Sequence, residues 1–465
     1  MNVQKLLRPA PASRDQGFTL IEVLVAMMVF GILSVLVAYL LTTAMTLTRS
    51  SRSSEVAANL AAQAIDQARS ATNVFTVVSG ATTTTVDGTT YTVTRSAGWL
   101  TNTGSASDCG TSGLLQNKTL NVAVTWSGMR AGTAAVQAST LLAPAGPIND
   151  PTTGTIIVHV RGAGGGGVGG VPIAVAPDST VSPNTATTVS PAPPATDIDG
   201  CSYILKVIPG TYLVTIGSAG DGRISTDQKN PIKLSVPVTA GQSSVLDKQY
   251  DTAATPKLTL VPGAPANTMF PTNLPITYLP QGDPYSVQVV KTTVTGVTTT
   301  STPLFPFGSG YQAFAGAYVA VGTSGGSPVC LSSNPAKWVV PNATGNVGQL
   351  QDPPITVDPG ASGTVPMPLV TVTTSSKWLV AVPAVSTTPA DPGCTATGLR
   401  LNFAQSSGNS AIIALPFGSW KIYALSNQSD SLQTSALVDA SKIALPAGSP
   451  PFTGSNIFTL DPRQP

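Results

Sequence analysis

The side chains best placed for chemistry stand at the start of a long apolar run. Gly17 precedes Phe18, and a single carboxylate, Glu22, follows four residues later. From Val23 to Thr48 no side chain is charged. A carboxylate in such a run costs about 2.5–3.5 kcal/mol in lipid, so we expect a partner that offsets its charge. Gly17 has no side chain, so another protein can approach the backbone closely at this position.

The residues around this junction resemble the class III signal of type IV pilins and pseudopilins. That motif has Gly before the cut, Phe after it and Glu at the fifth mature position. Gly17, Phe18 and Glu22 match all three, and residues 19–21 read Thr-Leu-Ile between them. The resemblance implies cleavage between Gly17 and Phe18 by a prepilin peptidase and N-methylation of Phe18. It also implies that Glu22 pairs with the Phe18 amine of a neighbouring subunit during assembly.

The segments around the motif predict how the chain lies in a membrane. A bilayer core of about 30 Å needs roughly 20 apolar residues in a helix, and residues 18–41 supply them. The leader, residues 1–17, carries Lys5, Arg8 and Arg14 against one acid, which keeps it cytoplasmic by the positive-inside rule. We therefore expect a single-pass protein of the cytoplasmic membrane. Its later modules would be extracellular and then part of a cell-surface pilus.

Helical character continues beyond the apolar run. Residues 42–70 contain neither Pro nor Gly and are rich in Ala and other helix-forming residues. We therefore predict one helix over residues 18–70, with a first half suited to a membrane or filament core and a second half suited to a globular head. The pilin family usually places a kinking proline in the first half. This chain has no proline between Pro11 and Pro144, so the sequence leaves the kink open.

Strand-forming residues follow the helix. Residues 71–143 contain alternating β-branched side chains, and Asp87-Gly88 between two such runs is a hairpin signal. These features predict a small antiparallel β head laid on the helix. A linker rich in Pro, Gly and Asp follows at residues 144–153.

Beyond the linker the chain reads as a series of all-β modules. The first resembles the carboxypeptidase-regulatory-like or Cna-B-like β-sandwich in its turns and strands, at Gly170–Val175, Asp199-Gly200 and Pro209–Tyr212. An apolar-Pro, Gly and aromatic order returns in residues 304–316 and 415–425. We predict three immunoglobulin-like modules of about 100 residues each: 154–255, 256–366 and 367–465. The predicted fold class is thus α+β, with a long pilin helix, a β head and about three sandwiches.

Composition limits the classes of function and partner. Charged residues are 9% of the 465, below the roughly 25% of typical soluble domains. The net charge is +2, so we expect no nucleic-acid partner. The four cysteines are far apart, and in an exported protein we expect up to two disulfides. Four cysteines allow three pairings, among which the sequence does not choose: Cys109, Cys201, Cys330 and Cys394.

No catalytic, metal or cofactor site is predicted. His159 is the only histidine and lies in an alternating strand, so a catalytic triad or a His-based metal site is not expected. Gly164–Gly167 lacks the Lys-Ser/Thr of a phosphate loop. Asp197, Asp199 and Gly200 resemble part of a calcium loop, but the terminal Glu is missing, so a turn is the better interpretation. We therefore expect a protein that is not an enzyme.

The resemblance implies a structural and interaction protein. We expect a minor, tip-like type IV pilin that displays its modules for adhesion or spacing, because three extra modules on every subunit would crowd a filament wall. The alternative is a pseudopilin of a type II-like secretion or competence DNA-uptake apparatus. An enzyme displayed on the anchor is a third hypothesis. The implied partners are prepilin peptidase, other pilin subunits, the pilus assembly platform and a surface or host ligand, in a Gram-positive host.

Overall fold

The computed structural model describes most of the chain as two compact units. The described residues are 19–100, 106–110, 115, 117–144, 148, 150–282, 289–292, 297–300, 303–317, 330–358, 360–375, 377–385, 391–396, 398–454 and 456–464. The first unit is built from Met1–Leu100 and Asn117–Ala145, and the second from Thr101–Gln116 and Gly146–Pro465. The leader with Gly17, and Phe18 after it, lie outside the described residues.

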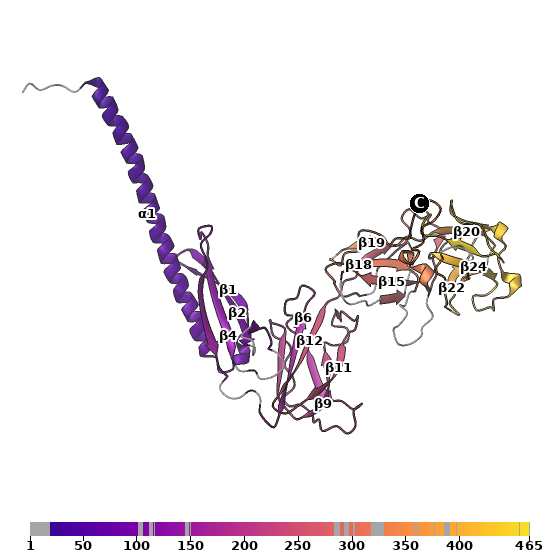
Figure 1. The fold of residues 1–465 in the computed structure, drawn as a ribbon, viewed down its shortest axis with the longest axis horizontal. Helices are drawn as coiled ribbons and strands as arrows, with labels where there is room; N and C mark the ends of the chain where they lie inside the picture. The colour runs from indigo at the N-terminus through magenta and orange to yellow at the C-terminus, as the bar shows by residue number, and fades with distance from the viewer. Residues whose placement is uncertain are drawn as a thin grey trace, which may run out of the picture. The chain divides into compact units, whose positions relative to one another are not determined.

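The N-terminal helix is confirmed as the longest element of the chain. Helix α1 (Leu20–Arg69) has 50 residues and runs without interruption (Figure 1). This continuity follows from a sequence that lacks proline throughout the segment. The helix begins after Thr19, whose backbone amide donates to a carboxylate oxygen of Glu22 at 3.3 Å. It ends at Ser70, whose amide donates to the carbonyl of Asp66 at 3.0 Å.

The second half of α1 packs on an antiparallel sheet of the same unit. The order of its strands is β1-β2-β4-β5. A short helix, η1 (Val74–Thr76), connects α1 to the first strand. The predicted hairpin joins its first two strands, because Asp87 and Gly88 both have the positive φ angles, 48° and 74°, that a tight turn requires. The strands are β1 (Gly80–Val86), β2 (Thr89–Leu100), β4 (Lys118–Trp126) and β5 (Val136–Leu142), and the β2–β4 connection contains β3 (Ala106–Ser107).

Small side chains on one face of α1 allow the close helix–sheet contact. Ala57 and Ala61 are 0% and 1% exposed, and they join one hydrophobic cluster with Leu120 and Val122 of β4. At the end of the helix, the guanidinium of Arg69 donates to the Thr140 hydroxyl of β5 at 2.8 Å. The part of this unit that we call the head is therefore a sheet with one helix across it.

The second unit begins with a β-sandwich. One sheet has the order β10-β12-β6-β8, with β6 and β12 parallel, and the other has the order β11-β9-β7. Tyr212 is fully buried between them, and its hydroxyl donates to the carbonyl of Ile208 at 2.9 Å. The strands are β6 (Gly154–Arg161), β7 (Ile173–Pro177), β8 (Cys201–Val207), β9 (Gly210–Ile216), β10 (Arg223–Ser225), β11 (Ile232–Val238) and β12 (Ser243–Thr252).

In the rest of the second unit, the described residues form four more sheets. Their orders are β17-β13-β19, β16-β15-β18, β14-β23-β20-β25 and β22-β21-β24-β26. The strands are β13 (Lys257–Thr259), β14 (Thr268–Met269), β15 (Pro275–Pro280), β16 (Val289–Thr292), β17 (Thr298–Thr300), β18 (Tyr311–Ala315), β19 (Ser362–Thr364), β20 (Leu369–Thr373), β21 (Trp378–Pro383), β22 (Leu401–Gln405), β23 (Ser410–Ala414), β24 (Gly418–Leu425), β25 (Ile443–Ala444) and β26 (Phe458–Leu460). Short helices η2 (Leu331–Ser333), η3 (Pro335–Lys337), η4 (Thr434–Ala436) and η5 (Ala440–Lys442) connect some of them.

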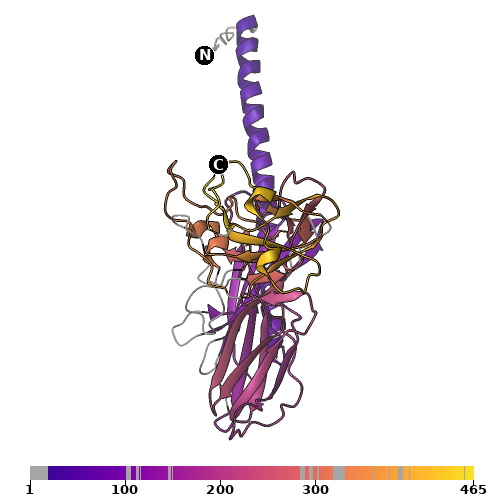
Figure 2. The ribbon, with the colours of Figure 1, turned by 90° about the vertical axis from the view of Figure 1, so that its right-hand side faces the viewer.

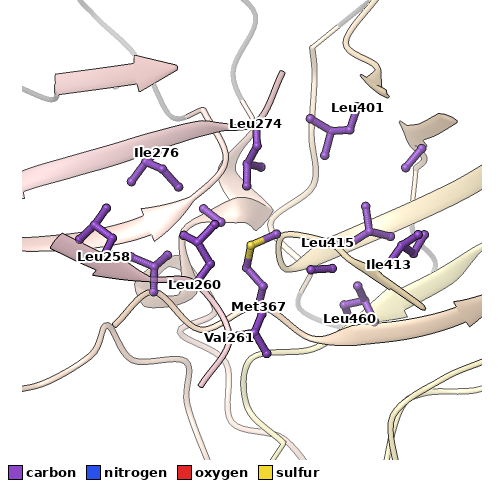
Figure 3. Packing of buried hydrophobic residues seen from close by; sticks show 14 of the residues in the cluster. Leu258, Leu260, Val261, Leu274, Ile276, Met367, Leu401, Ile413, Leu415 and Leu460 are labelled. Atoms are coloured by element: carbon purple, nitrogen blue, oxygen red, sulfur yellow. The ribbon is translucent and has the colours of Figure 1, made fainter. Parts of the chain in front are cut away.

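The last two predicted modules are not separate in the structure. Strand β14, from residues 256–366, pairs with β23, from residues 367–465. One hydrophobic cluster extends across both, and Figure 3 shows Met367 between Leu260 on one side and Leu415 on the other. The structure does not divide the chain at the predicted boundary of residues 256–366 and 367–465, because a strand of the first segment completes a sheet of the second. We call residues 256–464 the fused body.

The end of the fused body is held by a buried ion pair. Arg463 donates to Asp461 at 2.6 Å, and both side chains are at most 4% exposed. The guanidinium also lies 4.9 Å from the ring centre of Trp338 and donates to the carbonyl of Val340 at 2.7 Å. These contacts join the last strand region to the η3 segment, far away in sequence.

Candidate functional site

The first half of α1 begins with an apolar surface that the described residues of its own unit leave uncovered. Every residue from Thr19 to Arg52 is exposed or half-exposed, and Ser53 is the first buried residue of the helix. The large apolar side chains here are exposed, from 44% for Val23 to 81% for Leu20. The most apolar window of the helix has a mean hydropathy of 2.7 and none of it is buried, so the helix is long and apolar enough to cross a membrane. Figure 2 shows that the strands of the first unit do not extend along this half of the helix.

Glu22 is the one carboxylate of this surface. Besides the Thr19 amide, the Thr19 hydroxyl donates to its carboxylate at 3.2 Å. Shallow apolar depressions flank Glu22, one lined by residues that include Ile21 and Val25, the other by residues that include Val23 and Met27. Two long local hydrogen bonds offset little of the cost of a carboxylate in an apolar medium. The arrangement leaves the carboxylate available to a cation from outside the chain.

The structure places only one of the three predicted motif residues. Glu22 lies in the first turn of α1, where a carboxylate also favours the positive end of the helix dipole. Gly17 and Phe18 lie outside the described residues. Their cleavage and methylation, and the pairing of Glu22 with an amine, stay predictions.

The four cysteines form two disulfides in the structure. Cys109 bonds to Cys201, and Cys330 bonds to Cys394. This is one of the three pairings that the sequence left open. The first bond is almost completely buried, because Cys109 is 1% exposed and Cys201 is 2% exposed. Sequence spacing does not reveal this pairing, since it joins the β2–β4 connection to a strand of the sandwich.

His159 lies opposite Cys201 in the β6–β8 pairing. Its Nδ1 is 3.6 Å from a carboxylate oxygen of Asp247, which also accepts a 2.8 Å hydrogen bond from Arg161. Burial lowers the pKa of His159, against the opposing effect of Asp247. Within the described part of the chain, no group of three or more His, Cys, Asp or Glu side chains could hold a metal ion.

The turn before Cys201 and the glycine run have structural partners. Asp197 accepts the Cys201 amide on its side chain at 2.8 Å and the Gly200 amide on its carbonyl at 2.9 Å. The glycine run connects β6 to β7, and the carbonyl of Gly166 accepts the amide of Gly162 at 2.8 Å. Both segments thus have turn and loop geometry.

Residues 12–38 match the model of the prokaryotic N-terminal methylation motif. This match includes the Gly17-Phe18 junction, Glu22 and residues 20–38 of the exposed part of α1. The N-terminal segment is of the pilin type. The motif and the apolar helix together fit a single-pass, membrane-anchored subunit that later lies on the cell surface.

The comparisons with whole proteins add less. Among curated proteins, none matches the chain. Three solved structures are similar at low level: the TIE protein of Bacillus anthracis (12% identity, 76% of this chain and 65% of that one, TM-score 0.19), a streptococcal ancillary pilin (13%, 52% and 75%, 0.21), and BcpA, the major pilin subunit of Bacillus cereus (12%, 62% and 92%, 0.19). The chain thus spans less than two thirds of the TIE protein. At these scores the likeness carries no functional argument.

Proposed function

We propose that this chain is a minor, tip-located subunit of a type IV pilus. Prepilin peptidase cuts it between Gly17 and Phe18, the new Phe18 amine is methylated, and the first half of α1 packs among the helices of other pilins. The fused body and the first sandwich then project from the filament for adhesion to a surface or host ligand, or for spacing.

The observation that carries this proposal is the contrast within α1. The methylation motif leads into a first half that is exposed as far as Arg52 and apolar over residues 20–41, while the second half is covered by the sheet of the same unit. Exposed apolar surface of this extent marks a membrane or protein interaction site. A helix that leaves lipid must exchange lipid contacts for contacts with other apolar helices, and a pilus core supplies them.

The size of the second unit supports a tip position. Gly146–Pro465 belongs to this unit, which is far larger than the head. A unit of this size on every subunit would compete for the space around a filament, whereas a single copy at the end meets no such crowding. Charged residues are sparse, so contacts with a ligand would rest on shape and hydrogen bonds more than on long-range attraction.

The N-terminus of the mature protein tests the processing step. We expect mass spectrometry of the chain purified from its cells to give a first residue of N-methylated Phe18. A variant with Gly17→Leu should retain Met1 because its side chain blocks close approach of the peptidase. Intact Met1 in the native chain, from cells that process other prepilins, would contradict the proposal.

Replacement of Glu22 tests the assembly step. We expect Glu22→Ala to reduce incorporation into sheared pili by roughly two to more than three orders of magnitude, since leaving one partner of a buried ion pair alone costs about 3–5 kcal/mol. Glu55→Ala is the matched control, because Glu55 is an exposed acid on the second half of the same helix. Equal incorporation of both variants would sink the assembly role of Glu22.

Location separates the pilus from the secretion or uptake alternative. Immunogold labelling of the fused body should mark one end of extended filaments at low copy number. Label confined to the envelope, together with loss of secretion or DNA uptake in a deletion strain, would favour the pseudopilin role instead.

A further inference from the structure

The chain passes between its two compact units three times. It leaves the first unit after Leu100, returns at Asn117 and leaves again after Ala145. The excursion between the first two passages contains Cys109, which is bonded to Cys201 at the start of β8. The two units are therefore joined by a disulfide-anchored segment as well as by the linker at residues 144–153.

The disulfide closes a loop that includes the whole linker. Its two cysteines are 92 residues apart in sequence, but their Cα atoms are 5.4 Å apart. Between them lie β4 and β5 of the head, the linker, and β6 and β7 of the sandwich. When the chain is pulled by its two ends, the shortest covalent path runs along α1, β1 and β2 to Cys109, then through the bond to Cys201. Residues 110–200 lie outside that path.

We propose that the Cys109–Cys201 disulfide transmits mechanical tension past the linker. We call this covalent route the bypass. Tension between the N-terminal helix and the fused body crosses the sulfur–sulfur bond, and the linker bears none of it. A cut in the linker therefore leaves the projecting part attached. Only the origin of the tension rests on the proposed pilus function, since the covalent path belongs to the chain itself.

The surroundings of Cys201 anchor the bond in the sandwich. Cys201 opens a strand that pairs with β6, a central strand of its sheet. The turn before it is fixed by Asp197, and Gly200, at φ 79°, has no space for a side chain because a Cβ would meet the carbonyl of Val160. Tension applied to Cys201 is therefore transmitted to a hydrogen-bonded sheet. Burial of both sulfurs also protects the bond from external thiols.

A protease site in the linker tests the bypass directly. In the full-length chain in detergent, a protease recognition sequence is inserted between Thr152 and Thr153, next to the exposed residues at the start of the linker turn. After cleavage we expect a single band on a denaturing gel without reductant and two fragments after dithiothreitol, which takes the two sulfurs to thiols as it becomes a cyclic disulfide. Separation into two fragments without reductant would overturn the proposal.

Paired serine variants supply the controls for the same gel. Cys109→Ser with Cys201→Ser should give two fragments whether or not reductant is present. Cys330→Ser with Cys394→Ser removes the other disulfide, which does not span the linker, and should behave as the parent does. Two fragments from this control without reductant would contradict the assignment of the bypass to Cys109 and Cys201.

Single-molecule pulling measures the load path in length. With handles on both ends of the full chain, loss of the first disulfide should increase the fully extended length by about 320 Å at roughly 3.5 Å per residue. Loss of the second, whose cysteines are 64 residues apart, should increase it by about 220 Å. The linker-cleaved parent should still hold tension, and the cleaved Cys109→Ser, Cys201→Ser variant should not. The bypass would be refuted if the uncleaved Cys109→Ser, Cys201→Ser variant had the same extended length as the parent. It would also be refuted if the cleaved parent came apart under tension.

These measurements use purified protein and do not require a pilus. If incorporation into pili fails but the cleaved chain stays joined, the proposed function is wrong and the bypass stands. If the cleaved chain separates while Phe18 processing and incorporation succeed, the bypass is wrong and the pilin role stands.

Discussion

The two halves of α1 differ in what covers them. Residues 20–52 have bulky apolar side chains and no cover from the chain, whereas the buried residues between 53 and 68 are mostly alanines beneath the head sheet. Both halves have residues that favour helix, so helix propensity does not distinguish them. The difference lies in side-chain size. Alanine lets a sheet approach closely, while Leu, Val, Met and Phe extend outward to fill space in a lipid or helical environment.

This comparison shows that the two halves of one continuous helix are suited to different surroundings. The second half contributes to the stability of the folded head, and removing its packing would unfold that head. The first half contributes nothing to the head, so substitutions there should change where the chain resides and what it joins. The two classes of effect can be separated by the same substitution made in each half.

The largest expected effect is on membrane insertion. Val29→Lys places a charge in the middle of the bare half and should cost about 2.5–3.5 kcal/mol, roughly a hundredfold in the insertion equilibrium. Ala58→Lys is the matched variant, because Ala58 is exposed on the second half. We expect alkaline extraction to release the first variant and retain the second. Equal retention of both would break the division between the halves.

A smaller effect is expected on the stability of the head. Ala61 is 1% exposed against the sheet, so Ala61→Leu should overpack the contact and lower the free energy of unfolding of the head by about 1–3 kcal/mol. Ala26→Leu makes the same change in the bare half and should leave the head unaltered. Denaturant titration of the detergent-solubilised chain, followed by fluorescence of the tryptophans, measures both. A loss of stability from Ala26→Leu would show that the first half also supports the fold.

Local patterns predicted what they directly encode. The uninterrupted α1, the hairpin at Asp87 and Gly88, and the β-rich region after residue 154 could all be inferred because hydrophobic period and turn chemistry act over a few residues. The bare and covered halves of α1 could also be inferred, from the change between bulky residues and alanine. Glu22 was found in the same way, as a lone charge in an apolar run.

Long-range pairings could not be predicted from these patterns. The pairing of β14 with β23 joins segments about 140 residues apart, and no local signal in a two-residue strand such as Thr268–Met269 indicates its partner. The repeat spacing therefore suggested a boundary at residue 366 where the core is continuous. The Arg463–Asp461 pair on Trp338 and the choice of disulfide partners depend on the same distant folding.

The smallest predicted effect is a dependence of stability on pH, which should differ between the first sandwich and the head. The chain has one histidine, His159, and it lies in the first sandwich, so the head and α1 have none. Burial lowers the pKa of His159 below the ordinary histidine value of about 6.5. The unfolded chain therefore binds a proton in a pH range where the folded chain does not. Stability of the sandwich should fall as pH decreases through 6.5, and level off below the folded pKa.

Hydrogen exchange at pH 7.5 and 5.5, corrected for intrinsic rates, measures this difference strand by strand. Protection of β6 and β8 amides should decrease by up to about tenfold for each unit by which the pKa is lowered, while β2 and β4 should not change. His159→Gln should abolish the decrease in β6 and β8, because it removes the one histidine of the chain. An equal decrease in β2 and β4 would contradict this prediction, because the head contains no histidine. It would mean that the two units unfold together.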